Sequence, residues 1–507
     1  MKTSVNKSNG NAIARLCWLW FVSLLPWLLY VQGVSVSVRI DVVIINGADF
    51  NIPEDLSKHL PKNFVRRGWE EDVKELQYNL SYTVRSKRDL SHVVPSKVRH
   101  TLLVYNHTNK ADLSGNAHLR NAIMLDLYSA TRSMYLGEPP QQLPALIFQV
   151  TKRLMFPNPL RLLPPKTADC VMLRVVVVGA EDSATAKHIE EFVTRTIDVE
   201  LYKSILDIGR DPRGARNSSV EIQYVDTSKG PLNSIALADA MVESRDSLTL
   251  SLDTNILYTD LIHHGVPYSE DAHTRGVSED QMTLFLFVFD SKPALLDGEF
   301  QAVAKGGGVI FVVSNVCVNQ EESCTAYRSK RTGVLDLTDP SVPALYALLE
   351  IAHGVAGPLQ DTVGSEREFW SELCATESVI SSMLVAASRN FAERTHARLS
   401  KAISKARSLL LNVETLMNRT AAGECEKLIA ESEELLSGCL TAAQSINVPL
   451  TTDRCSLALG STCQLEATML QIEQTLTSCD SSPQQIGADD QETYSFLLLL
   501  SALVLVF

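Results

Sequence analysis

Between Cys170 and Val355 the sequence alternates short apolar runs with longer amphipathic segments. The runs read "CVMLRVVVVG", "SVEIQYVD", "MTLFLFVFD" and "GGGVIFVVSN", and they are rich in β-branched residues. Continuously apolar strands that alternate with helices are typical of a largely parallel sheet covered by helices on both faces. The pattern therefore predicts an α/β unit over residues 165–360.

Helices are expected between and after these strands. The expected segments are residues 182–206, 231–244, 295–305 and 341–355. The first would begin at Asp182 or Ser183, which are residue types that favour helix N-caps.

Another α/β unit is expected before this one, over residues 34–160. Its expected elements are strands at 36–47, 79–86 and 98–106 and helices at 69–77 and 119–137. The segment Pro157–Lys166 has four prolines in ten residues, so it cannot continue a helix or a central strand. It is expected to separate the two units.

Beyond residue 366 the apolar residues recur mostly three and four apart, which predicts long amphipathic helices. The expected helices are 380–416, 421–443 and 456–476. Folding the last two back around Val448 would bring Cys439 near Cys455 and Cys425 near Cys463. The expected fold class is therefore α/β: two α/β units with mainly parallel sheet, followed by a disulfide-stapled α-helical bundle over residues 366–480.

The N-terminus has the layout of a secretory signal peptide. Three basic residues precede the apolar run Leu16–Val31, and small residues follow near Gly33. The run is shorter than the roughly 20 residues that span a bilayer. We expect residues 1–33 to be removed, with an uncleaved signal anchor as the alternative.

A secretory route would expose the chain to glycosylation and to an oxidising compartment. Asn-x-Ser/Thr sequons lie at Asn79, Asn106, Asn217 and Asn418. Of the ten cysteines, nine remain without Cys17, so at least one thiol would be unpaired within the chain. The disulfide candidates are Cys317, Cys324, Cys374, Cys425, Cys439, Cys455, Cys463 and Cys479.

The last residues, Ser495–Phe507, form an uncharged run that is short for a membrane-spanning helix. A polar spacer and the small residues of "SCDSS" precede it. This order is the layout of a glycosylphosphatidylinositol (GPI) attachment signal, in which residues 483–507 are removed and lipid is attached at Ser481, Ser482 or Asp480. A C-terminal membrane helix and a buried apolar tail are the alternatives.

Charge and motifs argue against several functions. The formal net charge is −13, or −16 after the three basic residues of the signal are lost, and no long basic block favours nucleic acid as a partner. The loop in "VVVVGAEDSATAKH" lacks the glycine and lysine pattern of nucleotide sites, and "VFDSKPALLD" lacks the serines of an integrin-type metal site. No cofactor is expected.

One loop gathers candidate metal ligands and acid–base groups. Within Thr259–Asp280 these are His263, His264, Glu270, Asp271 and His273. No helical spacing fixes the directions of these side chains, so a solvated insertion is the simpler interpretation. A divergent metal-dependent hydrolase that uses this loop is the alternative function.

The tetrapeptide "RSKR" occurs at Arg85–Arg88 and again at Arg328–Arg331. It matches the substrate pattern of subtilisin-like proprotein convertases, so cleavage after Arg88 or Arg331 is one interpretation. Two solvated basic turns are the other.

The stretch Leu284–Asn315, together with the opening "VRIDVVIING" and the late helical region, resembles an uncharacterised family of plant and protist secretory-pathway membrane proteins. The resemblance implies a signal peptide, an α/β ectodomain and an apolar C-terminus. It brings no catalytic motif.

These features together predict a non-catalytic glycoprotein of the secretory pathway and cell surface. Its ectodomain would be extracellular or lumenal and would be attached to the membrane by a lipid anchor or a C-terminal helix. It would act in binding, surface organisation or assembly, with a protein or a glycan as partner.

Overall fold

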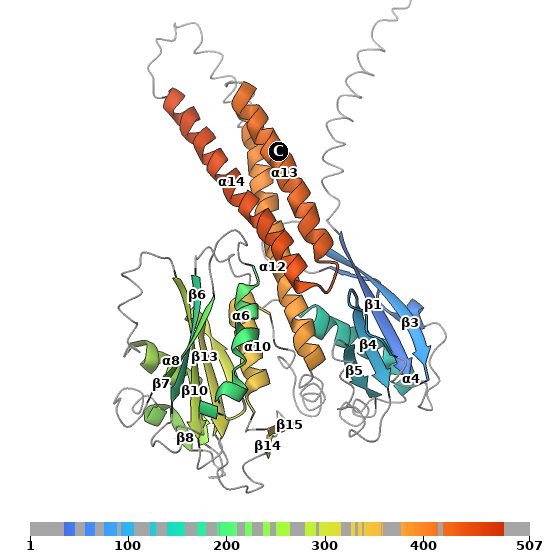
Figure 1. Cartoon of the computed structure of the whole chain (residues 1–507), viewed down its shortest axis with the longest axis vertical. Coiled ribbons are helices and arrows are strands. Elements are labelled where there is room, and N and C mark those ends of the chain that lie inside the picture. The colour runs from blue at the N-terminus through green and yellow to red at the C-terminus, as the bar shows by residue number, and fades with distance from the viewer. Residues whose placement is uncertain are drawn as a thin grey trace, which may run out of the picture. The chain divides into compact units, whose positions relative to one another are not determined.

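Figure 1 shows the computed structural model of the chain. The structure describes residues 35–45, 56–65, 76–88, 93–105, 122–127, 139–157, 170–178, 190–191, 193–209, 218–225, 237–243, 250–263, 279–289, 294–315, 326–329, 333–336, 339–355, 357, 377–413 and 419–480. The chain divides into two compact units: unit 1 is Met1–Lys401 with Glu433–Leu459, and unit 2 is Ala402–Ser432 with Gly460–Phe507.

The first sheet of unit 1 has five strands in the order β2-β3-β1-β4-β5. They are β2 (Asn63–Val65), β3 (Gln77–Lys87), β1 (Ser35–Ile45), β4 (His100–Tyr105) and β5 (Ala122–Asp126), and the short helix α2 (Leu56–His59) precedes β2. Every pairing is parallel except that of β2 with β3. The three strands expected from the sequence, now β1, β3 and β4, are confirmed.

The helix expected at 119–137 is wrong where the structure describes it, because Ala122–Asp126 forms the edge strand β5. Ala122, Ile123 and Leu125 are buried, and a short apolar run of this kind fits a strand or a buried helix equally well. Pairing with β4 decides between them. The sequence also gave no indication of α4 (Pro139–Val150), which continues into the π-helical turn η4 (Thr151–Met155).

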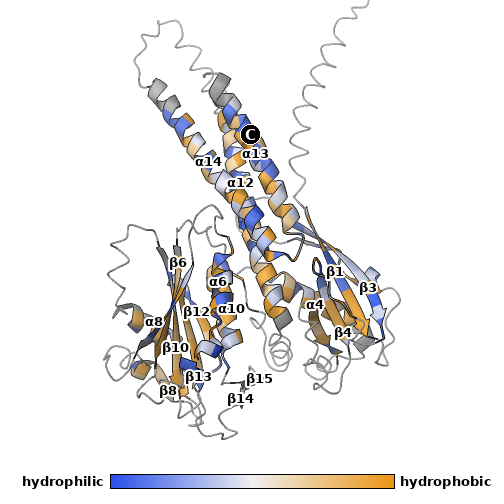
Figure 2. Ribbon diagram, in the orientation of Figure 1, coloured by the Kyte–Doolittle hydropathy of each residue, from blue (hydrophilic) through white to orange (hydrophobic). Residues whose placement is uncertain are grey.

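The second sheet of unit 1 has the order β12-β13-β10-β6-β7. Its strands are β12 (Ala302–Lys305), β13 (Val309–Asn315), β10 (Glu279–Phe289), β6 (Cys170–Val178) and β7 (Ser219–Val225), with the 3₁₀ turn η5 (Gly306–Gly308) before β13. Only the β12–β13 pairing is antiparallel. The central strands β10 and β13 are mostly hydrophobic, as Figure 2 shows, and Phe285, Phe287 and Phe311 pack with ring centroids 5.8–6.4 Å apart.

The parallel strands of both sheets follow one topology. In chain order the first strand lies between the second and the third, and the fourth is outermost: β3-β1-β4-β5 in one sheet and β7-β6-β10-β13 in the other. Both are therefore doubly wound, with strand order reversing at β1 and at β6. The parallel α/β prediction is confirmed in both halves.

The helix expected at 295–305 is wrong, because the chain forms β11 (Ala294–Leu296), a turn and then β12. Asp297 and Gly298 have φ values of 50° and 72°, which interrupt a right-handed helix. The Asp297 carboxylate holds this turn by accepting hydrogen bonds from the N–H and the hydroxyl of Thr254 at 2.8–3.0 Å. β11 pairs with β9 (Leu250–Leu252), which also pairs with β8 (Met241–Glu243).

Two further helices are shorter than the sequence predicts. The one expected at 182–206 is interrupted at residues 197–198, where the Asp198 carboxylate accepts the Leu201 N–H as the N-cap of α6 (Val199–Asp207). The one expected at 231–244 gives way to β8. Helix α8 (Thr254–His263) was not expected, whereas α10 (Ser341–His353) is confirmed. The short strands β14 (Ala326–Ser329) and β15 (Gly333–Asp336) pair with each other.

Three long helices complete the chain: α12 (Glu377–Val413), α13 (Arg419–Ala442) and α14 (Val448–Asp480). They confirm the expected helical region, although α14 begins earlier than predicted. Asn447 caps it by accepting the Leu450 N–H at 3.1 Å. The expected Cys439–Cys455 disulfide joins α13 to α14 within unit 1.

The expected Cys425–Cys463 pairing is wrong. Both thiols are free in unit 2, with Cys425 buried and Cys463 exposed. Ser432 of α13 meets Ser461 of α14, and because the helices are antiparallel, Cys425 lies level with Thr468 rather than with Cys463. A mismatch of five residues separates the two levels by about 7 Å at 1.5 Å per residue.

Candidate functional site

Polar side chains of α12 bind the C-terminal ends of neighbouring helices in unit 1. Ser382 donates to the Leu154 carbonyl at 3.1 Å, and Arg389 donates to the carbonyls of Met155 at 3.4 Å and Ala443 at 3.1 Å. Asn390 donates to the His353 carbonyl. These carbonyls lie at the ends of η4, α13 and α10, where no intrahelical donor is available. The helix α12 therefore caps three other helices.

Arg389 is the most deeply enclosed cation of this arrangement, with 1% of its surface exposed. Its guanidinium lies 5.0 Å from the centre of the Phe156 ring, which in turn packs at 4.9 Å against Tyr78. The Tyr78 hydroxyl donates to Glu393, one helical turn after Arg389. Carbonyl dipoles at two helix ends and an aromatic face offset part of the cost of burying this charge.

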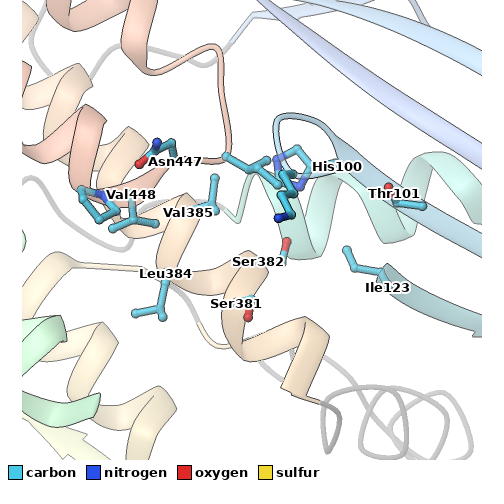
Figure 3. A pocket seen from close by; sticks show the side chains of 12 residues that line it. His100, Thr101, Ile123, Ser381, Ser382, Leu384, Val385, Asn447 and Val448 are labelled. Atoms are coloured by element: carbon cyan, nitrogen blue, oxygen red, sulfur yellow. The ribbon is translucent and has the colours of Figure 1, made fainter. Parts of the chain in front are cut away.

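A cavity of 390 Å³, here called the α12 cavity, lies beside the first part of this helix. Its walls are the start of β4 with the preceding turn, Ile123 of β5, Ser381–Val385 of α12, and Ile446–Pro449 between α13 and α14. Figure 3 shows the His100, Ser382, Val385 and Val448 side chains converging from these elements. The cavity lies at the amino ends of β4 and β5, away from the carboxyl ends at which doubly wound sheets usually bind ligands.

His100, the first residue of β4, is the central polar group of the cavity. The side chain is 5% exposed, and its enclosed Nε2 atom has no hydrogen-bond partner within the described residues. Burial, assisted by the positive charge of Arg389, holds the pKa of His100 well below its usual value. The imidazole is therefore neutral at pH 7 and offers one donor and one acceptor.

Lys97 is held at the cavity by a compact turn. The Ser96 hydroxyl accepts the N–H groups of Val98 at 3.2 Å and Arg99 at 3.1 Å, and the Ser96 N–H donates to the Thr101 hydroxyl at 3.1 Å. Serine side chains of this kind replace backbone turn bonds. Lys97 lies between these anchors with its side chain exposed, so the turn presents a cation at the cavity wall.

The wall formed by Ile446–Pro449 is fixed from three directions. The Cys439–Cys455 disulfide closes the loop that contains it, and Arg389 holds its beginning through the Ala443 carbonyl. The Thr451 hydroxyl donates to the Ala442 carbonyl at 3.1 Å. The cavity wall is therefore part of a cross-linked helix–turn–helix.

Exposed apolar side chains adjoin the segments that line the cavity. Among the described residues, seven large hydrophobic side chains are exposed. Three of the seven belong to these segments: Val94 and Val98 are 87% and 62% exposed in the turn, and Leu450 is 41% exposed at the start of α14. The segments that line the cavity therefore carry exposed apolar side chains as well as the cation Lys97.

Two of the three hydroxyls that line the cavity take part in hydrogen bonds of the fold. Ser382 donates its proton to the Leu154 carbonyl, and Thr101 accepts from the Ser96 N–H. A nucleophilic serine would instead need to pass its proton to a neighbouring base, so Ser382 is not arranged as a nucleophile.

Of the sequence-predicted metal ligands, His263 is described, and it does not line this cavity. Residues 259–263 form the end of α8, and 279–280 begin β10. His263 ends α8, while His264, Glu270, Asp271 and His273 lie outside the described residues. Within the part of the chain that is described, no group of three or more His, Cys, Asp or Glu side chains could hold a metal ion.

Some predicted modification sites are placed. Asn79 is half-buried on β3, and its neighbours on that face, Gln77 and Ser81, are also partly or fully exposed. Residues Arg85–Lys87 pair with β1, so a protease would have to unpair this strand before cleaving after Arg88. Asp480 ends α14, and Cys479 also lies in that helix. The remaining predicted sites, Asn106, Asn217, Asn418, Arg331, Ser481, Ser482, Cys317, Cys324 and Cys374, lie outside the described residues.

The described helices include none long and apolar enough to cross a bilayer. Both terminal apolar segments lie outside the described residues. The sequence matches no protein-family model, and no curated protein matches it at a significant level.

Proposed function

We propose that the protein is a non-catalytic, membrane-attached ectodomain that binds a small ligand in the α12 cavity. The observation that carries this proposal is the cavity itself: 390 Å³ of space with mainly apolar walls and a few convergent polar groups. Pockets for small ligands commonly have 300–1,000 Å³ and the same mixture of walls.

The surroundings of the cavity support binding. His100 lines the cavity, and the adjoining turn and helix start expose Val98 and Leu450. The wall is also cross-linked, so little ordering would be needed on binding.

The location of the ectodomain is proposed from the sequence. The apolar run Leu16–Val31 would direct the chain into the secretory pathway, and Ser495–Phe507 would serve as a GPI-attachment signal or a membrane helix. A chain that takes this route would be glycosylated at its sequons and would act at the cell surface or in the lumen of the pathway.

Ser381 allows a direct test, because it is exposed at the cavity wall on α12. In a Ser381→Cys variant of the full chain, we expect octanoate or octanamide to slow alkylation of the introduced thiol by N-ethylmaleimide. Peptide mapping by mass spectrometry would separate this thiol from the native ones. Ser408→Cys, at an exposed serine elsewhere on α12, is the matched control and should show no slowing. Unchanged rates at both positions would contradict the proposal.

A further inference from the structure

We infer that the α12 cavity is selective for a small amphiphilic carboxylate, whose apolar tail fills the cavity and whose charged head faces Lys97 and His100. The inference rests on the proposed binding function and adds the chemical class of the ligand. Three properties of the cavity support it: the charge of the lining residues, the polar groups in the wall and the volume.

The charge of the lining has one sign. Lys97 is its one ionised side chain, and no Asp or Glu takes part. The chain as a whole has a net charge of −13, so a cationic cavity without a facing carboxylate is a departure from its average surface. Lys97 would attract an anion, and no carboxylate of the lining would repel it.

The polar groups of the cavity offer what a carboxylate accepts. His100 lines the cavity and its imidazole is neutral, so it brings no second charge and needs no acid as a partner. Val448 and Pro449, in the first turn of the 33-residue helix α14, form the facing wall. The N-terminal end of a helix carries partial positive charge, which adds to that of Lys97.

The rest of the lining suits a short hydrocarbon chain. Ile123, Leu384, Val385 and Ile446 supply apolar walls. The volume of 390 Å³ lies at the lower end of the range of about 300–1,000 Å³ found for small-molecule pockets. A medium-chain carboxylic acid belongs to this size class.

The test compares ligands that differ only in the head group. In the Ser381→Cys full chain, octanoate should protect the introduced thiol from alkylation at about tenfold lower concentration than octanamide, the difference expected for one hydrogen bond to a charged group. Adding Lys97→Met should weaken protection by octanoate and leave octanamide unchanged. Lys62→Met, at an exposed lysine away from the cavity, should change neither.

The outcomes separate this inference from the proposed function. If octanamide protects as well as octanoate, the cavity binds amphiphiles but the preference for carboxylates is wrong. If Lys97→Met leaves the preference for octanoate intact, the placement of the charged head beside Lys97 is wrong. If neither compound protects, the binding function fails and the inference fails with it. Lys97 is exposed, so its replacement should leave the fold intact and the comparison valid.

Discussion

At the scale of single residues, His100 links the fold to the candidate site. The imidazole is enclosed at the first position of β4, near the buried guanidinium of Arg389. A charged imidazole there would lose hydration and face a like charge, so the folded protein keeps it neutral. The burial of this imidazole therefore makes the fold sensitive to acid.

Acidification should therefore weaken the folded state through His100. The folded-state pKa lies well below 6.5, so the unfolded chain binds a proton first as the pH falls. Stability from this residue is complete above pH 6.5 and decreases below it, by up to about 1.4 kcal/mol for each pH unit. Between pH 7.5 and 5.5 the wild type should lose about 1 kcal/mol more than His100→Gln, measured by urea unfolding with circular dichroism. Identical losses would show that His100 does not titrate in this way.

At the scale of elements, α12 does more than bury an apolar face. Its side chains Ser382, Arg389 and Asn390 cap other helices, while Phe391 packs against Gly209 after α6. A Cβ at Gly209 would come within 2.9 Å of that ring, and the residue has a φ of 90°, so only glycine fits without strain. The helix thus contacts elements from both α/β halves of unit 1.

Replacing Arg389 with Met should loosen the helix ends that it caps. The side chain would keep its apolar bulk but leave the Met155 and Ala443 carbonyls without their donor, which costs about 1–3 kcal/mol for each buried acceptor. Hydrogen–deuterium exchange in peptides covering 150–157 and 440–447 should accelerate by at least about tenfold. Arg407→Met, at an exposed arginine of the same helix, should have little effect there. Unchanged exchange in both peptides would show that these bonds contribute little.

Several elements could be predicted from the sequence because their signal is local. The strands β6, β10 and β13 are continuous apolar runs, and α12 and α13 have long helical periodicity. Two expected helices were wrong because distant contacts determine the secondary structure there. The strand β5 forms because it pairs with β4. The strands β11 and β12 are separated by the Asp297–Gly298 turn, which a hydrogen bond from Thr254 stabilises. No local pattern reports a partner that lies far away in the chain.

The candidate site was harder to predict than the fold. Its walls come from four separate segments. The strand at 98–106, the helix at 380–416 and the reversal of the chain near Val448 were expected, but the strand β5 was not, and no pattern placed the four segments together. The combination of Lys97, His100 and exposed valines in "VVPSKVRH" was visible in the sequence, but nothing there placed it beside α12. The histidine-rich loop at 259–280 attracted attention by composition alone, and its described ends belong to α8 and β10.

At the scale of the whole molecule, the two sheets of unit 1 share one parallel topology, and β4 in one and β13 in the other are buried along their whole length. The carboxyl ends at their order reversals, after Ile45 and Tyr105 in one sheet and after Val178 and Phe289 in the other, lead into segments outside the described residues. The α12 cavity lies at the amino ends of β4 and β5 and does not use those positions.

Membrane attachment is tested on intact cells. If residues 483–507 are replaced by a lipid, phosphatidylinositol-specific phospholipase C should release the protein into the medium. Retention, under conditions in which another GPI-anchored protein is released from the same cells, would favour a C-terminal membrane helix.

Because α12 caps its neighbours with side-chain donors, the hydrogen bonds at these helix ends tolerate mutation of the acceptor residues better than mutation of the donor residues. Its partners contribute backbone carbonyls at Leu154, Met155, His353 and Ala443, and every amino acid carries that group. Substitutions at those four positions keep the acceptor, whereas a change at Ser382, Arg389 or Asn390 removes the donor. As the sequence drifts, the hydrogen bonding of this junction constrains side chains in one short stretch of one helix, whereas at the helix ends that it binds only burial and packing restrict the choice of side chain.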